Sequence, residues 1–228
     1  MTQGKDFKHL RERAVKTLIE RGVLRSPNVI KAMRNVPREE FLPESMREEA
    51  YIDTPLPIGY KQTISALHMV VIMAEQLELD VGQNVLEIGA GSGYHSAILA
   101  EIVGRDTGEN RCHVYTIEII PELAEYAQKN LKQLGYEDIV TVRLGDGTLG
   151  YPDFAPYDRI LVTAAAPNVP NSLTEQLKVN GLLLIPVGDL YFGQELLKIK
   201  KISETKTSTS YLGGVRFVPL TGKHGWDV

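Results

Sequence analysis

The segment from Val85 to Tyr94 constrains the fold more than any other stretch of this chain. It begins with an apolar run rich in β-branched residues, breaks into three glycines at alternate positions, and leads directly into a helix-like run at residues 95–103. A strand, a glycine turn and a helix in this order bring a nucleotide-like ligand to the carboxyl end of the first strand of a doubly wound α/β domain. Glycine allows both the sharp turn and a close approach of the ligand to the backbone.

The spacing of these glycines separates two kinds of cofactor. A dinucleotide fingerprint, G-x-G-x-x-G counted from Gly89, would need a third glycine where Tyr94 stands. The sequence instead reads Gly89, Gly91 and Gly93, preceded by Glu87. This pattern resembles the S-adenosylmethionine site of Rossmann-like methyltransferases, whose cofactor has no pyrophosphate for a helix N-terminus to bind. A chance glycine-rich turn is the alternative, because a lone glycine motif is weak evidence.

Composition and charge fit one α/β domain of a cytoplasmic protein. The 228 residues are 43% hydrophobic, which suffices for a single large core. No apolar run approaches the length of a membrane span, the first 13 residues are too polar for a secretory signal, and Cys112 is the only cysteine. The net charge is -4 and the charges are interspersed, which argues against a nucleic-acid partner. We expect a monomer without a metal site or a membrane partner.

The apolar periodicity divides the chain into a helical beginning and an alternating core. Helices are predicted at residues 6–21, from Ser26-Pro27 onward and around 36–44. Residues 1–60 are therefore expected to form a helical cap and a substrate-side segment at one edge of the cleft, and residues 61–228 the core of the same domain. A helix at 64–79 leads into the glycine-turn strand, and a polar insertion at 105–111 is expected to be a solvated loop or hairpin tip.

The core alternates between strands and helices. Strands are predicted at 85–88, 113–118, 139–144, 159–163 and 182–187, and helices at 95–103, 121–134 and 172–178. Alternation of this kind indicates a parallel sheet with helices on both faces. The last two strands, at 195–202 and 211–220, have no helix between them and should pair antiparallel at one sheet edge. The predicted fold class is α/β, a Rossmann-like methyltransferase fold with an antiparallel C-terminal edge.

Two carboxylates stand where such a fold meets a nucleoside. Glu118 ends the second strand, where two acceptor oxygens can bind both ribose hydroxyls, and Ile119 could pack on the adenine. Alternatively, Glu118 is a helix N-terminal glutamate favoured by the helix dipole. Asp146-Gly147 ends the third strand, where a carboxylate can accept from the adenine amine and glycine lets the ring approach; an Asp-Gly turn is the alternative.

The segment after the fourth strand bears on the methyl acceptor. Residues 162–167, Val-Thr-Ala-Ala-Ala-Pro, include no acidic or amide side chain that could accept the protons of a target amine. This argues against amine methylation and is compatible with an acceptor that is already ionised at pH 7, a carboxylate with a pKa of about 3.5–4. Such a nucleophile needs no general base.

Several further motifs extend along nearly the whole chain in a fixed order. The sequence resembles the protein-L-isoaspartate (D-aspartate) O-methyltransferase family at the following segments: Val36–Phe41, Pro55–Tyr60, Gln62–Ser65, Val85–Tyr94, Gly145–Gly147, Val162–Pro167, Pro186–Gly188 and Val215–Leu220. The resemblance implies transfer of a methyl group from S-adenosylmethionine to the free α-carboxylate of an isoaspartyl residue in a damaged protein, with S-adenosyl-L-homocysteine as the other product. The ester then collapses to a succinimide.

The resemblance also assigns roles to residues. It places Ser65 in the active site, where its hydroxyl could hold one oxygen of the substrate carboxylate, with Thr63 at the cofactor. Ordinary helix capping by Ser65 or Thr63 is the alternative. It further implies that two segments help to bind the substrate backbone: Pro57, Ile58 and Gly59, and Val215, Arg216 and Phe217. His68 and His95 are interpreted as packed or half-exposed helix residues.

The chain departs from the family's pattern at two places. Lys61 stands where the family often has glycine, so this lysine either favours anionic peptides or points to solvent. Ala66-Leu67 follow Ser65 where a proline is common. Three rival functions share parts of the pattern: a small-molecule or RNA methyltransferase, a nicotinamide dehydrogenase, which the glycine spacing disfavours, and a non-catalytic nucleotide-binding protein, which would have no use for Ser65.

Overall fold

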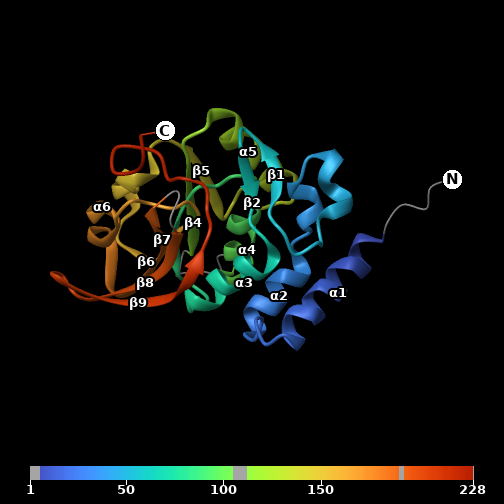
Figure 1. Ribbon diagram of the computed structural model, residues 1–228, viewed down its shortest axis with the longest axis horizontal. Coiled ribbons are helices and arrows are strands. Elements are labelled where there is room, and N and C mark those ends of the chain that lie inside the picture. The colour runs from blue at the N-terminus through green and yellow to red at the C-terminus, as the bar shows by residue number, and fades with distance from the viewer. Residues whose placement is uncertain (1–5, 105–111, 190–192, 228) are drawn as a thin grey trace.

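The structure, a computed structural model, describes residues 6–104, 112–189 and 193–227 (Figure 1). The predicted insertion at 105–111 lies outside these residues. The helices are α1 (Phe7–Glu20), α2 (Pro27–Asn35), α3 (Leu67–Gln76), α4 (Tyr94–Val103), α5 (Pro121–Gln133) and α6 (Asn171–Glu175), with short 3-10 helices at Arg38–Phe41, Glu44–Glu49, Gly147–Leu149 and Pro152–Phe154. The strands are β1 (Leu56–Gly59), β2 (Gln62–Ile64), β3 (Asn84–Ile88), β4 (His113–Glu118), β5 (Val140–Leu144), β6 (Tyr157–Val162), β7 (Leu177–Asp189), β8 (Gly193–Ser203) and β9 (Lys206–Val215).

Seven strands form one sheet in the order β5-β4-β3-β6-β7-β8-β9. The five strands from β5 to β7 are parallel, and β8 and β9 add antiparallel at one edge. The predicted fold class is therefore confirmed. The chain passes from β3 to β4 on one side and returns with β6 on the other, so the strand order reverses at β3. In open α/β sheets a ligand cleft forms at the carboxyl ends of the strands at such a point.

The two faces of the sheet are covered unequally. Alternate residues of β3 point to opposite faces: Val85 packs into the larger core together with residues of α1 to α5, and Leu86 into a smaller core that includes Leu173 of α6. Helices on both faces were predicted, but α6 ends at Glu175, earlier than expected, because Leu177 already begins β7 and pairs with Tyr157. The N-terminal helices lie at the opposite end of the molecule from β8 and β9 (Figure 1).

The C-terminal strand is shorter than predicted. The ladder between β8 and β9 ends where Gln194 pairs with Val215. The side chain of Gln194 then binds the main chain of Phe217 through both its oxygen and its nitrogen. Beyond this point, Ala165 donates to Val218 and accepts from Leu220, both at 2.8 Å. The expectation of a strand over 211–220 was therefore wrong in its second half, since these residues leave the sheet edge and run beside the end of β6.

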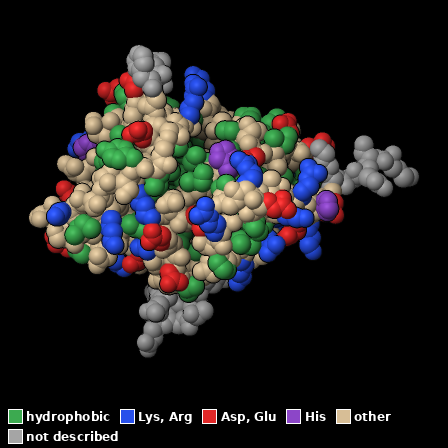
Figure 2. Space-filling view, turned by 60° about the horizontal axis from the view of Figure 1, so that its bottom comes forward, with side chains coloured by type: hydrophobic (Ala, Val, Ile, Leu, Met, Phe, Trp, Pro, Cys, Tyr) green, Lys and Arg blue, Asp and Glu red, His purple; other side chains and the backbone are tan. Residues whose placement is uncertain are grey.

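Charged side chains of both signs are interspersed on the face that Figure 2 shows, without a continuous basic stripe. Within the described ranges, no helix has both the length and the apolar character that crossing a bilayer requires.

Candidate active site

A cavity of about 530 Å³ opens at the carboxyl ends of β3, β4 and β6. The glycine turn, the residues after β4 and β6, and the turn and second strand of the β1–β2 hairpin all line it. Its lining includes residues 60–65 and 88–92, Tyr94 and His95, residues 117–120, Gly147, Thr163 and Ala164, and residues 218–221. The glycine turn and the Gln62–Ser65 motif, two segments far apart in the sequence, therefore meet in one cavity.

The glycine turn has a backbone that other residues rarely adopt. Gly89, Gly91 and Gly93 have φ angles of +95°, +54° and +86°, in the region where a Cβ is penalised. A Cβ on Gly89 would also clash with the hydroxyl of Thr163. That hydroxyl donates to the carbonyls of Ile88 (3.0 Å) and Gly89 (2.8 Å), so the residue after β6 holds the start of the turn in place.

Glu118 binds this turn from the next strand. One carboxylate oxygen accepts from the backbone N–H of Gly91 at 2.9 Å, and the other accepts from Ile119 and Ile120 at 2.9 and 3.1 Å. Glu118 is buried and lines the cavity, and Ile119 lies beside it, 41% exposed. A carboxylate has about four acceptor positions, so three N–H donors leave Glu118 room for one further strong hydrogen bond from the cavity.

The cavity also contains two buried polar atoms without partners. The hydroxyl of Ser92 and Nε2 of His95 have no hydrogen-bond partner among the described residues, although Ser92 is 2% and His95 7% exposed. Burial, with the nearby charge of Arg38, lowers the pKa of His95 to about 3, so its imidazole is neutral. Unpartnered buried polar groups are costly, and a polar ligand in this cavity would satisfy them. The prediction for His95 missed this, because the direction of a helical side chain depends on distant elements.

Ser65 and Thr63 both line the cavity, together with residues of the glycine turn. Capping of α3 by Ser65 or Thr63 was the alternative for both, and the structure shows that it is wrong. The N-cap of α3 is Ala66, and no side chain at that position caps the helix. Asp53, which is distant in sequence, accepts instead from the backbone N–H of His68 at 2.8 Å. The hydroxyl of Ser65 is therefore not used as a helix cap.

The comparison with family models agrees with this geometry. Residues 9–225 match the model described as protein-L-isoaspartate(D-aspartate) O-methyltransferase. The chain belongs to this family. A protein-L-isoaspartate O-methyltransferase from Staphylothermus marinus is 56% identical over 220 residues, which cover 96% of this chain and 97% of the relative. One from Hyperthermus butylicus is 52% identical over 222 residues, with 96% and 92% covered.

Solved members of the protein-L-isoaspartate O-methyltransferase family have the same fold. One matches with a TM-score of 0.83 and 32% identity, covering 94% of this chain and 67% of its own. Another, described as a Plasmodium falciparum protein-L-isoaspartate O-methyltransferase in complex with S-adenosyl-L-homocysteine, matches with a TM-score of 0.81 and 26% identity over 96% of this chain and 99% of its own.

The substrate-side residues that the family resemblance implied are not in the lining of the cavity. Pro57, Ile58 and Gly59 belong to β1, and Ile58 packs close to Gly91 behind the turn. Val215 ends β9 and packs on the larger core, and Arg216 is exposed. Their contact with the substrate remains a prediction. The lining contains instead Tyr60, Lys61 and residues 218–221. Tyr60 and residues 218–220 belong to the family-like segments, but the resemblance did not assign them to the substrate.

Asp146 is also engaged elsewhere, although Gly147 lines the cavity. One oxygen of Asp146 accepts from the N–H and hydroxyl of Thr148 at 2.8 and 2.6 Å. The other accepts from the N–H of Lys223 at 2.8 Å. In the structure, Asp146 thus fastens the C-terminal segment beside the cavity. Its predicted contact with the adenine amine would have to share these oxygens.

Glu87 lies outside the cavity, on the face of the sheet that α4 covers. It is fully buried, and one of its oxygens accepts from the hydroxyls of Ser96 and Thr116, while the other has no partner within the described part of the chain. Burial raises the pKa of this carboxyl to about 7, against an ordinary value of 4.5. The structure does not bring Glu87 to the position of a cofactor ligand, because alternate residues of β3 face away from each other.

Replacing Glu87 with glutamine should remove a pH dependence of stability. The pKa of Glu87 is higher in the folded than in the unfolded state. Its contribution to the unfolding free energy is therefore fully present below about pH 4.5 and is lost as the pH rises through about 7. The two values correspond to roughly 3 kcal/mol of unfolding free energy as an upper bound. The unfolding free energy, measured with urea, should differ less between pH 5 and pH 8 for Glu87→Gln than for the parent protein. Substitution of the exposed Glu125 by glutamine should leave that difference unchanged. An equal difference in all three proteins would contradict the assignment.

Proposed function

We propose that the protein transfers the methyl group of S-adenosylmethionine to the free α-carboxylate of L-isoaspartyl residues in damaged proteins and peptides, forming an ester that collapses to a succinimide. The observation that supports this most is the meeting of the glycine turn, Glu118 and Ser65 in one cavity of a family member. S-adenosyl-L-homocysteine would be the second product. We also propose a cytoplasmic monomer with no nucleic-acid or membrane partner.

The residues of the cavity fit the methyl donor. One of its ribose hydroxyls would donate to the remaining acceptor position of Glu118, and apolar Ile88, Ile117 and Ile119, which line the cavity, would surround its adenine ring. The unpartnered hydroxyl of Ser92 and Nε2 of His95 offer hydrogen bonds to its polar amino-acid end. Glu87 would act through the position of α4, whose Ser96 it binds, and not by direct contact. When bound, the donor supplies an electrophilic methyl group on a positively charged sulfur.

The acceptor side of the cavity needs to position the substrate carboxylate and does not need to deprotonate it. The substrate carboxylate is ionised at pH 7, and the cavity residues 163 and 164, a threonine and an alanine, include no acidic or amide acceptor for the protons of an amine. The hydroxyl of Ser65 would donate to one carboxylate oxygen and leave the other free to attack. Holding the reacting groups at near-attack distance under the β1–β2 hairpin can lower the barrier by several kcal/mol.

Paired peptides that differ only in one residue test this function. One peptide has aspartate and the other L-isoaspartate at the same position, and both are incubated with S-adenosylmethionine labelled in its methyl group. We expect label to enter only the isoaspartyl peptide, as a base-labile ester. Equal labelling of both peptides, or of neither, would exclude the proposed acceptor, and calorimetric titration with S-adenosyl-L-homocysteine would then show whether the cofactor assignment still holds.

Lys61 should influence which peptides are preferred. Tyr60 and Lys61 form the turn between β1 and β2 with φ angles of +52° and +59°, line the cavity and are exposed. Left-handed backbone at non-glycine residues is unfavourable and gathers at functional sites. In place of the glycine common in the family, this turn presents a cation at the mouth of the cavity.

We therefore expect Lys61→Gln to raise the KM of isoaspartyl peptides with flanking acidic residues by about three- to tenfold at low salt, and to leave the KM of peptides with flanking lysines unchanged or lower. The difference should shrink in high salt. Lys129→Gln, an exposed lysine of α5 outside the cavity lining, serves as the control. An equal change in KM for all peptides would show that Lys61 does not discriminate between peptides by their charge.

A further inference from the structure

We propose that Arg38 is a positioning residue that fixes Ser65 relative to the glycine turn. The inference rests on the proposed function, in which Ser65 holds the acceptor carboxylate. Arg38 begins the short 3-10 helix Arg38–Phe41 of the N-terminal cap and does not line the cavity. From outside the lining it contacts two residues of the lining, Ser65 and Tyr94.

The first contact is with the segment that holds Ser65. Arg38 is fully buried, and its guanidinium donates from Nη2 to the carbonyl of Ser65 and from Nε to the carbonyl of Ala50, both at 2.8 Å. Ser65 lies between the end of β2 at Ile64 and the start of α3 at Leu67. No strand ladder or helix therefore takes up its carbonyl, and the hydrogen bond from Arg38 fixes this residue.

The second contact is with the wall formed by α4. The guanidinium carbon of Arg38 lies 5.0 Å from the centre of the Tyr94 ring, within the range of a cation–π interaction. Tyr94 is the first residue of α4, directly after Gly93, and it lines the cavity. A single buried side chain thus connects the acceptor-side residue Ser65 with the helix that follows the donor-side turn.

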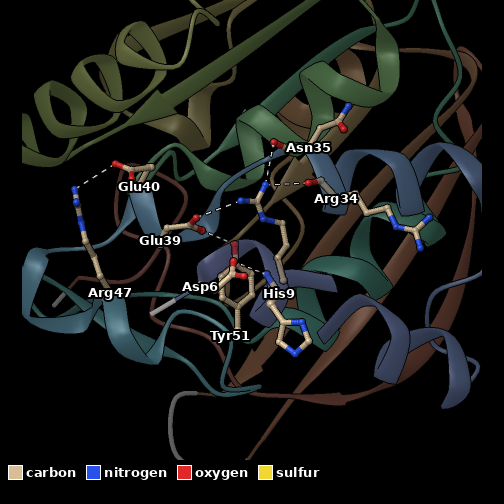
Figure 3. Close-up of polar contacts among 9 residues, drawn as sticks. Asp6, His9, Arg34, Asn35, Glu39, Glu40, Arg47 and Tyr51 are labelled. Carbon is tan, nitrogen blue, oxygen red and sulfur yellow. Dashed lines mark hydrogen bonds and ion pairs between the residues drawn. The ribbon is translucent and has the colours of Figure 1, made fainter. Parts of the chain in front are cut away.

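Among the described residues, no carboxylate lies within ion-pair distance of Arg38, and the nearby Asp53 is engaged by Arg21 and His68. The adjacent carboxylate, Glu39, is occupied by an ion pair with Arg11 at 3.2 Å and by the hydroxyl of Tyr51 (Figure 3). Nη1 of Arg38 has no hydrogen-bond partner within the described ranges. A buried cation without a counterion is unfavourable for folding, and an apolar residue would fill the same space at lower cost. Stability alone therefore does not account for arginine here.

The shape of the guanidinium explains the residue type. Its planar fork can donate to two carbonyls that lie in different directions while its face rests on an aromatic ring. Lysine keeps the charge but has a single nitrogen on a flexible stem. Arg38→Lys therefore removes the geometry and retains the charge, which makes it the informative substitution. Arg159 provides a matched control, because its guanidinium also binds main-chain carbonyls, those of Leu77 and Glu78, and these residues lie outside the cavity lining.

The test is a double-mutant cycle of Arg38→Lys with Ser65→Ala, assayed with an isoaspartyl peptide under conditions where every variant is folded by circular dichroism. We expect Arg38→Lys to lower kcat about tenfold or more, with the dissociation constant of S-adenosyl-L-homocysteine changed less than about threefold. In the Ser65→Ala background, Arg38→Lys should lower kcat by less than about twofold, because the hydroxyl that Arg38 is proposed to position is absent there. Arg159→Lys should leave kcat unchanged in both backgrounds.

Amide hydrogen exchange of the unliganded protein gives a second readout that does not depend on turnover. Arg38→Lys should increase exchange over residues 63–67, whereas Arg159→Lys should not. An equal loss of kcat with and without the Ser65 hydroxyl, or unchanged exchange at residues 63–67, would overturn the inference. Because the exchange measurement needs no substrate, it also distinguishes failure of this inference from failure of the proposed function.

Discussion

Replacing Glu118 with glutamine should weaken the binding of S-adenosyl-L-homocysteine by about 100-fold. The carboxylate accepts three backbone N–H groups, those of Gly91, Ile119 and Ile120. A glutamine amide has one oxygen, so its NH₂ group would face at least one of these donors. Hydrogen bonds to a charged group contribute about 1.5–3 kcal/mol each, and about 1.4 kcal/mol corresponds to tenfold in affinity.

Calorimetric titration measures this loss without turnover. Glu101→Gln is the matched control, because Glu101 also accepts two hydrogen bonds, from Asn35 and Tyr136 at 2.8 and 3.0 Å, but lies outside the cavity lining. A ligand that lacks one ribose hydroxyl separates the two roles of Glu118. It should bind the parent protein more weakly than the complete ligand, and the difference should be lost in Glu118→Gln. Unaltered affinity in Glu118→Gln would exclude both the ribose contact and the anchoring of the turn.

The glycine turn and the alternating strands could be predicted because their causes are local. Three glycines at positive φ leave a signature in the sequence itself, and the alternation of apolar runs fixes a mostly parallel sheet. The ends of elements are decided by contacts that the sequence does not display. Residues 216–220 leave the edge of the sheet because they pair with the main chain at Ala165, a segment more than fifty residues earlier in the chain.

The role of a side chain could be predicted only where the local sequence determines which part of the structure it faces. Glu118, at the end of a strand next to the turn, was expected at the ribose or at the N-terminus of the next helix, and in the structure it lines the cavity while it accepts from Ile119 and Ile120. For Glu87, the alternation along β3 shows that it shares a face with Val85, but not that α4 packs on this face and binds its carboxylate through Ser96. Arg38 contacts Ser65 across 27 positions of sequence, and Asp53 caps α3 from 15 residues before His68. Pairings of this kind follow from the folded cap and not from local pattern.

Removing the hydroxyl of Ser65 should slow methyl transfer while leaving the methyl donor bound as before. Ser65→Ala deletes one hydrogen bond to the charged acceptor carboxylate, which is worth about 1.5–3 kcal/mol, and kcat/KM for an isoaspartyl peptide should fall by about 10- to 150-fold. The dissociation constant of S-adenosyl-L-homocysteine should be unchanged within about twofold. Thr63→Val, at the neighbouring position of the lining, should instead weaken binding of this ligand if Thr63 contacts the cofactor.

Stability separates this role from helix capping. Because Asp53 and not Ser65 accepts from the start of α3, Ser65→Ala should leave the melting temperature nearly unchanged, whereas Asp53→Ala should lower the unfolding free energy by about 0.5–2 kcal/mol. A loss of stability in Ser65→Ala with unchanged turnover would return Ser65 to a structural role. If kcat falls while KM and stability stay constant, the hydroxyl acts chiefly in the transition state, where the attacking oxygen must be held in line with the methyl group.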